Sequence, residues 1–202
     1  MTLQIGEAAP NFSARSTHGA FRFYSWMDGS WVVLLTYPRT ITPDCAKEIG
    51  TVERLQAEFE QRRCKVMGLA VEPVDDLDDW LAHIAAVSGQ TPSYPLIGSA
   101  DMHVARLFDL IRDGESQART MRRMIVIDPD RRVKLSVAYP MVTDAIFGEI
   151  LQMIEALQAA QGEERSAAVG SGTGRIANLA DLGPDTAGTP DVEDARTRRR
   201  VC

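Results

Sequence analysis

The chain has 202 residues, of which 45% are hydrophobic and 25% are charged, and its formal net charge at pH 7 is −6. These fractions are ordinary for a soluble globular protein, and the length suffices for one medium domain with a buried core. The negative balance argues against nucleic acid as a partner, because phosphate binding needs a basic surface. No run approaches the roughly 18 apolar residues of a membrane helix, so a membrane partner is not expected either.

The start of the chain and its three cysteines bear on the compartment. The first residues, MTLQIGEAAPNFSA, contain neither the basic nor the apolar segment of a signal peptide. Cys45, Cys64 and Cys202 form no CxxC pair and have no disulfide-framework or zinc-site spacing. We therefore expect a cytoplasmic protein with reduced thiols, without a metal or another cofactor.

Apolar and amphipathic segments alternate over the first 161 residues. In chain order, the patterns predict a small hairpin over 11–23 that turns at His18-Gly19, a buried strand over 31–36, a helix from about 43 to 63, a buried strand over 64–72, a helix over 75–89, a short strand over 94–99, a short helix over 101–110, a hairpin with a Pro-Asp turn over 122–139, and a helix over 143–158. Two βα units followed by a hairpin and a helix indicate an α/β domain with a mixed central sheet flanked by helices. That is the outline of a thioredoxin-like fold with an N-terminal hairpin extension.

The composition changes near residue 161. Residues 162–202 are rich in Gly, Ala, Thr, Asp and Arg and contain no aromatic side chain. Such a segment buries too little apolar surface to offset the entropy of ordering it. We therefore expect one domain over 1–161 and a flexible, disordered tail over 162–202. Its GSGTG run lacks the flanking strand and lysine of a phosphate-binding loop.

The position of Cys45 suggests a reactive thiol. Thr42 is suited to cap a helix that begins at Pro43, which places Cys45 in the first turn. Free backbone N–H groups and the helix dipole stabilise a negative charge there, so the thiolate is favoured, although Asp44 opposes it slightly. The alternative is that Cys45 is a small apolar residue facing the sheet.

Pro38, Thr42 and Cys45 match the Pro-x-x-x-Thr-x-x-Cys signature, and here the sequence resembles the peroxiredoxin family. Four further stretches resemble one-cysteine peroxiredoxins in the same order: GEAAPNFSA, GAFRFYSWMDGSWVVLLTYPRTITPDCAKEIG, PDRRVKLSVAYP and FGEILQMIEAL. The resemblance covers roughly residues 5 to 158.

The resemblance implies a thiol-dependent peroxidase that reduces hydrogen peroxide and alkyl hydroperoxides. Cys45 would be oxidised to a sulfenic acid and regenerated by an external thiol such as thioredoxin or glutathione. In this family Thr42 would contact thiolate and peroxide, Pro38 would shield the sulfur, and Arg122 would support the thiolate and polarise the O–O bond. Glu48 would orient Arg122. The resemblance also implies a homodimer.

Three further assignments follow from the positions of residues on the predicted strands. Arg122 rather than Arg123 is assigned to the site, because side chains alternate on a strand. Arg123 is then expected on the other side, as a solvated charge. Cys64 begins a buried strand and is expected to be an inert apolar residue.

Several residues depart from the family pattern. Tyr37 stands where many one-cysteine relatives have histidine, Thr40 where an aspartate is common, and Ala145 where a second arginine is expected. We therefore expect a slower or less selective peroxidase. Ser30 lacks the outer glycines of the lipase-like element of some relatives, and Tyr24 replaces its histidine, so lipase activity is not expected.

Two other functions compete with a peroxidase. A regulatory protein that senses oxidation at Cys45 would turn over little, and the missing arginine at Ala145 keeps this alternative open. A disulfide reductase is disfavoured, since that chemistry needs a second thiol beside the first. Cys202 could reach Cys45 at the end of a flexible tail, but its low effective concentration favours an external thiol.

Overall fold

The computed structural model describes residues 3–37, 43–70, 77–98, 103–110, 122–139 and 144–177. The chain divides into two compact units, Met1–Ala159 and Ala160–Cys202. The first unit contains the whole sheet. In the described part of the chain, no helix is both long and apolar enough to cross a membrane.

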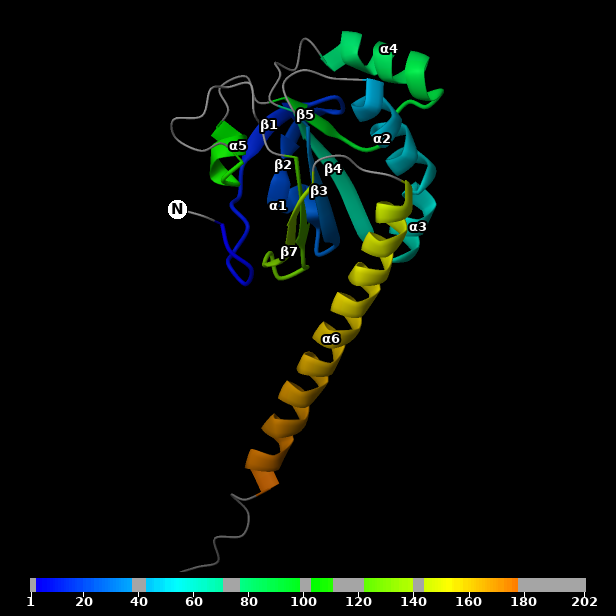
Figure 1. The fold of residues 1–202 in the computed structure, drawn as a ribbon. Helices are drawn as coiled ribbons and strands as arrows, with labels where there is room; N and C mark the ends of the chain where they lie inside the picture. The colour runs from blue at the N-terminus through cyan, green and yellow to red at the C-terminus, as the bar shows by residue number, and fades with distance from the viewer. Residues whose placement is uncertain are drawn as a thin grey trace, which may run out of the picture. The chain divides into compact units, whose positions relative to one another are not determined.

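Seven strands form one mixed sheet in the order β2-β1-β5-β4-β3-β6-β7 (Figure 1). Their bounds are β1 Ser13–Ser16, β2 Gly19–Arg22, β3 Trp31–Tyr37, β4 Cys64–Ala70, β5 Leu96–Gly98, β6 Arg123–Ile127 and β7 Val133–Ala138. Strands β3, β4 and β5 are parallel, and the other pairs are antiparallel. Every residue of β3 is buried, as a continuous apolar run predicts for a central strand.

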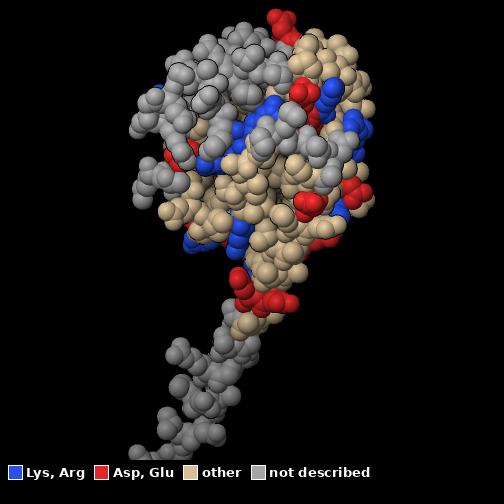
Figure 2. Space-filling view, in the orientation of Figure 1, with Lys and Arg blue, Asp and Glu red and all other residues tan. Residues whose placement is uncertain are grey.

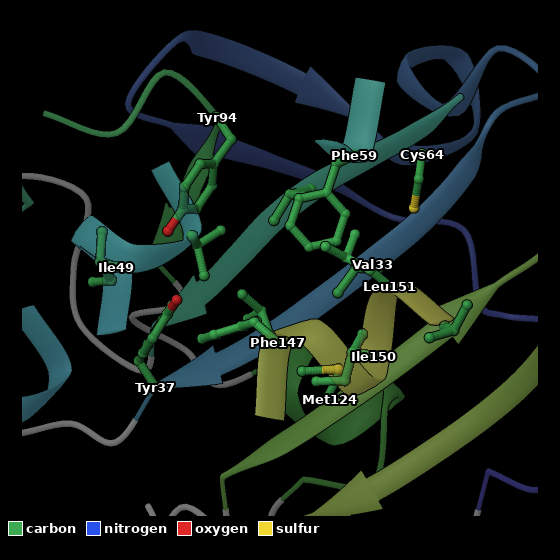
Figure 3. Packing of buried hydrophobic residues seen from close by; sticks show 14 of the residues in the cluster. Val33, Tyr37, Ile49, Phe59, Cys64, Tyr94, Met124, Phe147, Ile150 and Leu151 are labelled. Atoms are coloured by element: carbon green, nitrogen blue, oxygen red, sulfur yellow. The ribbon is translucent and has the colours of Figure 1, made fainter. Parts of the chain in front are cut away.

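Helices cover both faces of this sheet. Their bounds are α1 Phe23–Met27, α2 Pro43–Arg54, α3 Gln56–Gln61, α4 Leu77–Ser88, α5 His103–Leu107 and α6 Asp144–Ala177. Successive side chains of β3 point to opposite faces, so Val33 and Leu35 pack with α2, α4 and the start of α6, while Val32 and Leu34 pack with α1 and α5. Figure 3 shows the first of these two cores. The predicted thioredoxin-like α/β fold is confirmed.

The predicted helix over 43–63 is interrupted at Leu55, which separates α2 from α3. Leu55 has φ −96° and ψ 6°, outside the α-helical region. Its N–H donates to the carbonyls of both Thr51 and Val52, so the chain tightens locally toward a 3₁₀ turn. The apolar spacing that predicts one continuous helix does not register a deviation of a single residue.

The N-terminal hairpin also differs from expectation in detail. Ser16 pairs with Gly19, so the turn lies at Thr17 and His18 rather than at His18 and Gly19. The one-turn helix α1 follows directly and was not predicted. It buries Phe23 and Met27 in the second core and ends at Asp28, whose φ of 47° is left-handed.

Helix α6 continues to Ala177, past the predicted tail boundary at residue 161. Extending an existing helix avoids the cost of nucleating a new one, and residues 163–168, EERSAA, mostly favour helix. The backbone over 162–177 is therefore helical, unlike the predicted coil. Residues 178–202, including Cys202, lie outside the described residues, so the tail remains a prediction there.

Basic and acidic side chains lie together on the face shown in Figure 2. Among the ion pairs of this unit, the guanidinium of Arg62 pairs with Glu58 at 2.8 Å and with Glu155 at 2.7 Å. The pair with Glu155 links the C-terminal cap of α3 to the first part of α6. The two carboxylates are exposed, and ion pairs with exposed partners contribute little to stability.

Candidate active site

Helix α2 begins at Pro43 and holds Cys45 in its first turn, as its sequence predicts. Cys45 is fully buried, whereas the preceding Asp44 is exposed and forms a 3.8 Å ion pair with Lys47. Exposure to water and the pairing with Lys47 both weaken the repulsion that Asp44 exerts on a thiolate. The helix therefore presents the thiol to the protein interior and the carboxylate to solvent.

Arg122 joins this thiol to a carboxylate. It lies immediately before β6, and its Nη2 donates a hydrogen bond to the Sγ of Cys45. Its Nη1 lies 3.3 Å from the Oε2 of Glu48, one turn further along α2. The rigid fork of one guanidinium thus contacts both groups, a geometry that a lysine could not reproduce.

Glu48 is the buried anion of the site, and its side chain is 1% exposed. Its other carboxylate oxygen, Oε1, accepts a hydrogen bond from the hydroxyl of Tyr139 at 3.0 Å. Burial raises the pKa of Glu48 from 4.5 to about 7, although Arg122 and Tyr139 both act to lower it. The carboxyl group therefore changes protonation near neutral pH.

Two further phenols, besides Tyr139, lie close enough to interact with the charge of this carboxylate. Tyr37 ends β3 and Tyr94 precedes β5, and Figure 3 shows their hydroxyls pointing toward one another. Burial raises the pKa of Tyr37, Tyr94 and Tyr139, and the negative charge of Glu48 raises all three further. Each phenol therefore stays neutral at physiological pH, so these groups add no charge to the site.

Gly68 on β4 makes room for one of these rings. A Cβ at this position would lie 2.9 Å from Cε2 of Tyr37 and 2.5 Å from Cδ2 of Leu96. Glycine therefore lets Tyr37 lie over β4 in the core.

The structure brings together three of the five predicted site residues. Cys45, Arg122 and Glu48 are in mutual contact through the guanidinium. Pro38 and Thr42 lie outside the described residues, so their predicted roles stay predictions.

Arg123 extends away from Arg122, as strand alternation predicts, but it is not simply solvated. It is half-buried, and its Nη1 lies 3.4 Å from the backbone carbonyl oxygen of Asp109, just after α5. Its backbone N–H donates to Oγ1 of Thr36 at 2.7 Å. The expectation of a solvated charge is therefore wrong, because the α5 end of the second core provides an acceptor.

The surroundings of Cys64 are apolar, whereas Cys45 lies beside a charged guanidinium. It starts β4, is 3% exposed and packs in the first core (Figure 3). Burial raises the pKa of its thiol to about 12, so it stays protonated. This environment agrees with the expectation of an inert thiol.

Tyr139 is the site residue that the sequence interpretation missed. It follows β7 directly, opposite Arg122, and its backbone N–H donates to the Arg122 carbonyl at 3.2 Å. The predicted hairpin indicates that Arg122 has a cross-strand neighbour on its own face. A register shift between Val126 and Ile127 makes that neighbour Tyr139 rather than Ala138.

The arrangement provides a buried sulfur nucleophile with a fixed cationic donor beside it. A positive charge at that position favours thiolate and stabilises an oxygen that gains negative charge during attack. Within the described ranges, no three His, Cys, Asp or Glu side chains are grouped so as to hold a metal ion. The chemistry of the described groups is that of a thiol nucleophile.

Comparisons with known proteins agree with this chemistry. Residues 5–136 match the model of the AhpC/TSA family. Mouse (Mus musculus) peroxiredoxin-6 is 34% identical over 164 residues, covering 77% of this chain and 73% of the relative.

Solved structures show the same likeness. The yeast mitochondrial 1-Cys peroxiredoxin superposes with a TM-score of 0.73 at 32% identity, covering 81% of this chain and 80% of that one. Peroxiredoxin 6 of Arenicola marina gives 0.69 at 34% identity, covering 77% and 74%. The chain therefore belongs to the AhpC/TSA family, in its 1-Cys peroxiredoxin-like branch, and is a thiol-dependent peroxidase.

Proposed function

We propose that Cys45 is the peroxidatic thiol and that the substrates are hydrogen peroxide and alkyl hydroperoxides. The observation that carries this assignment is the guanidinium of Arg122, which donates to the sulfur of Cys45 while Glu48 holds its other nitrogen. Of the two thiols in the described residues, Cys45 has this charged partner, and Cys64 is held protonated by its apolar surroundings.

The first half-reaction is a displacement at oxygen. The thiolate of Cys45 attacks the terminal peroxide oxygen, the S–O bond forms and the O–O bond breaks. The electron pair of the broken bond leaves with the second oxygen, which takes up a proton to depart as water or an alcohol. Sulfur is oxidised to the sulfenic acid, and the peroxide is reduced.

Arg122 acts on charge in this step. Its guanidinium is fixed before the reaction begins, so little reorganisation is needed when negative charge moves onto the oxygens. Thr42 is proposed to donate to the peroxide and Pro38 to shield the sulfur, as the family signature suggests.

External thiols are proposed to complete the cycle. One thiol condenses with the sulfenic acid, releasing water and forming a mixed disulfide, and a second thiol reduces that disulfide. The yeast mitochondrial relative, which is 32% identical, has been described as having a thiol resolving mechanism via glutathione/thioredoxin systems, which supports one of these reductants. Cys64 is a poor resolving thiol because it is buried and protonated.

We also propose a homodimer in the reducing cytoplasm. Strand β7 is the last strand of the sheet, and its start is paired with the N-terminal segment through Gly6 and Glu7. Val137, further along, is 37% exposed, and an edge strand of this kind can pair with another copy. Sedimentation of the wild type and of Val137→Lys tests the dimer, and cell fractionation tests the compartment.

Turnover in the presence of thiols tests the proposed cycle. Purified protein is mixed with hydrogen peroxide or an alkyl hydroperoxide, and peroxide loss is followed with thioredoxin and its reductase, or with glutathione. Many turnovers per chain are expected. A single oxidation of Cys45 without turnover under every donor would instead support the regulatory sensor, which the absence of the second arginine at Ala145 keeps as the alternative.

A further inference from the structure

Glu48 is held by two donors, and the second of them has no place in the mechanism so far. Oε2 faces Nη1 of Arg122 at 3.3 Å, and Oε1 accepts from the hydroxyl of Tyr139 at 3.0 Å. Because each oxygen has its own donor, the carboxylate is fixed against rotation about its terminal bond. Glu48 can then orient the guanidinium so that Nη2 faces the sulfur of Cys45.

Tyr139 and Arg122 are cross-strand neighbours at the open end of the β6–β7 hairpin. Their backbones are opposite each other across the hairpin, as shown by the N–H of Tyr139 donating to the carbonyl of Arg122. The neighbouring register, Arg123 opposite Ala138, agrees with this pairing. Opposite side chains lie on the same face, so both reach Glu48, which comes from α2.

A purely structural role would not require this hydroxyl. The ring of Tyr139 belongs to the first core, and a phenylalanine would fill the same apolar space. The hydroxyl, however, meets a carboxylate rather than an apolar group. Burial and the charges of Glu48 and Cys45 raise the pKa of Tyr139, which keeps its proton available for donation.

We infer that Tyr139 is a positioning residue for Arg122, acting through Glu48, in the peroxidase reaction. The inference rests on the function proposed above. Tyr139 is then a second hydrogen-bond donor to the carboxylate of Glu48, besides Arg122.

The direct test follows the protonation of Glu48 without peroxide. Protein labelled with ¹³C at glutamate carboxyl carbons is titrated by NMR, and the Glu48 resonance is assigned by its loss in Glu48→Gln. Arg122 and Tyr139 contact Glu48, and Tyr37 and Tyr94 lie within reach of its charge. Cys45 is joined to it through Arg122. Tyr139→Phe removes one hydrogen-bond donor to the Glu48 carboxylate and leaves the other groups in place. The midpoint of the Glu48 titration should therefore move to a higher pH than in the wild type.

The second readout is the rate of Cys45 oxidation by hydrogen peroxide, measured by stopped flow at a pH above both midpoints. Tyr139→Phe should be about tenfold slower, as for other outer hydrogen-bond partners of reactive groups. In the Glu48→Gln background the same change should have almost no further effect, because the pathway through Glu48 is already broken.

Tyr24→Phe is the matched control. It removes a hydroxyl that donates to the backbone carbonyl of Ala9 at 2.6 Å, near the second core. It can lower stability, but it should move neither the Glu48 midpoint nor the oxidation rate. An unchanged midpoint in Tyr139→Phe, or equal slowing with and without Glu48, would overturn the inference. If the wild type does not consume peroxide, the proposed function fails, while the NMR titration still decides whether Tyr139 controls Glu48.

Discussion

Cys45 and Cys64 are both buried thiols, but their surroundings differ in charge. Cys45 lies in the first turn of α2 against the guanidinium of Arg122. Cys64 lies at the start of β4 among apolar side chains, where burial raises the pKa of its thiol to about 12. Burial alone therefore does not decide the reactivity of a cysteine. Of these two thiols, Cys45 has a guanidinium beside its sulfur, in a position to stabilise negative charge that develops during a reaction.

The largest expected effect comes from exchanging the thiol itself. Cys45→Ser should abolish peroxide reduction, because a serine hydroxyl is not ionised near neutral pH. Cys64→Ser should retain most of the activity. Thiol-dependent peroxide consumption measures both, and circular dichroism confirms that each variant is folded. Turnover by Cys45→Ser would show that another residue carries the reaction.

Removing the charge beside Cys45 should make the surroundings of its sulfur resemble the uncharged surroundings of Cys64. Arg122→Met should slow Cys45 oxidation by about 100- to 1,000-fold, as for other fixed donors to a developing negative charge. Stopped-flow oxidation by hydrogen peroxide is the measurement.

Arg123→Met is the matched variant for this experiment. It removes the same charge from the next residue, whose guanidinium contacts the carbonyl of Asp109 on the other face. Its oxidation rate should be that of the wild type, with a loss of about 1 kcal/mol in unfolding free energy. Similar slowing by both substitutions would be incompatible with the assigned strand faces.

The buried carboxylate makes the stability of the Cys45 region depend on pH. Burial raises the pKa of Glu48 to about 7 from 4.5, so the folded state favours the neutral carboxyl. The resulting stability is complete below pH 4.5 and is lost as pH rises through about 7. Between pH 5 and pH 8, the wild type should therefore lose up to about 3 kcal/mol relative to Glu48→Gln, which cannot titrate there.

Urea unfolding of both proteins at pH 5, 6.5 and 8 measures this difference. Comparing the two proteins cancels the contribution of every other titrating group. A stability difference that stays constant with pH would mean that Glu48 does not titrate in this range.

The smallest expected effect on activity concerns the apolar region. Cys64→Ser places a hydroxyl in apolar surroundings and should reduce the unfolding free energy by about 1–3 kcal/mol. Cys64→Val should be tolerated better, because it keeps the site apolar. Neither variant should change the rate of Cys45 oxidation. Loss of that rate at normal stability would give Cys64 a role in the reaction that its environment does not indicate.

The sequence predicts the sheet, the start of α2 and the position of Cys45 because these depend on local signals. The apolar run of β3 and the Pro43 that opens α2 are local features of this kind. The site residues Arg122 and Glu48 follow from the family resemblance, since nothing local distinguishes them from surface charges. The break at Leu55 escapes prediction because it is a deviation of one residue within an otherwise continuous apolar spacing. The length of α6 escapes prediction because it results from extension of an existing helix.

Tyr139 escapes prediction for a more specific reason. Counting outward from the Pro-Asp turn, Ile127 pairs with Val133, which would place Ala138 opposite Arg122. A register shift between Val126 and Ile127 changes the pairing by one residue, so Tyr139 takes that position instead. Such a bulge inserts one unpaired residue and cannot be read from alternation of apolar residues.

This bulge links an exposed turn to the reactive thiol. Surface turns ordinarily accept insertions and deletions during evolution. Here a change of one residue in the Pro-Asp turn, at the opposite end of the hairpin from Arg122, would exchange the faces of Ala138 and Tyr139 unless the bulge changed as well. The length of this turn is therefore expected to vary among related sequences much less than its exposure and its distance from Cys45 would suggest.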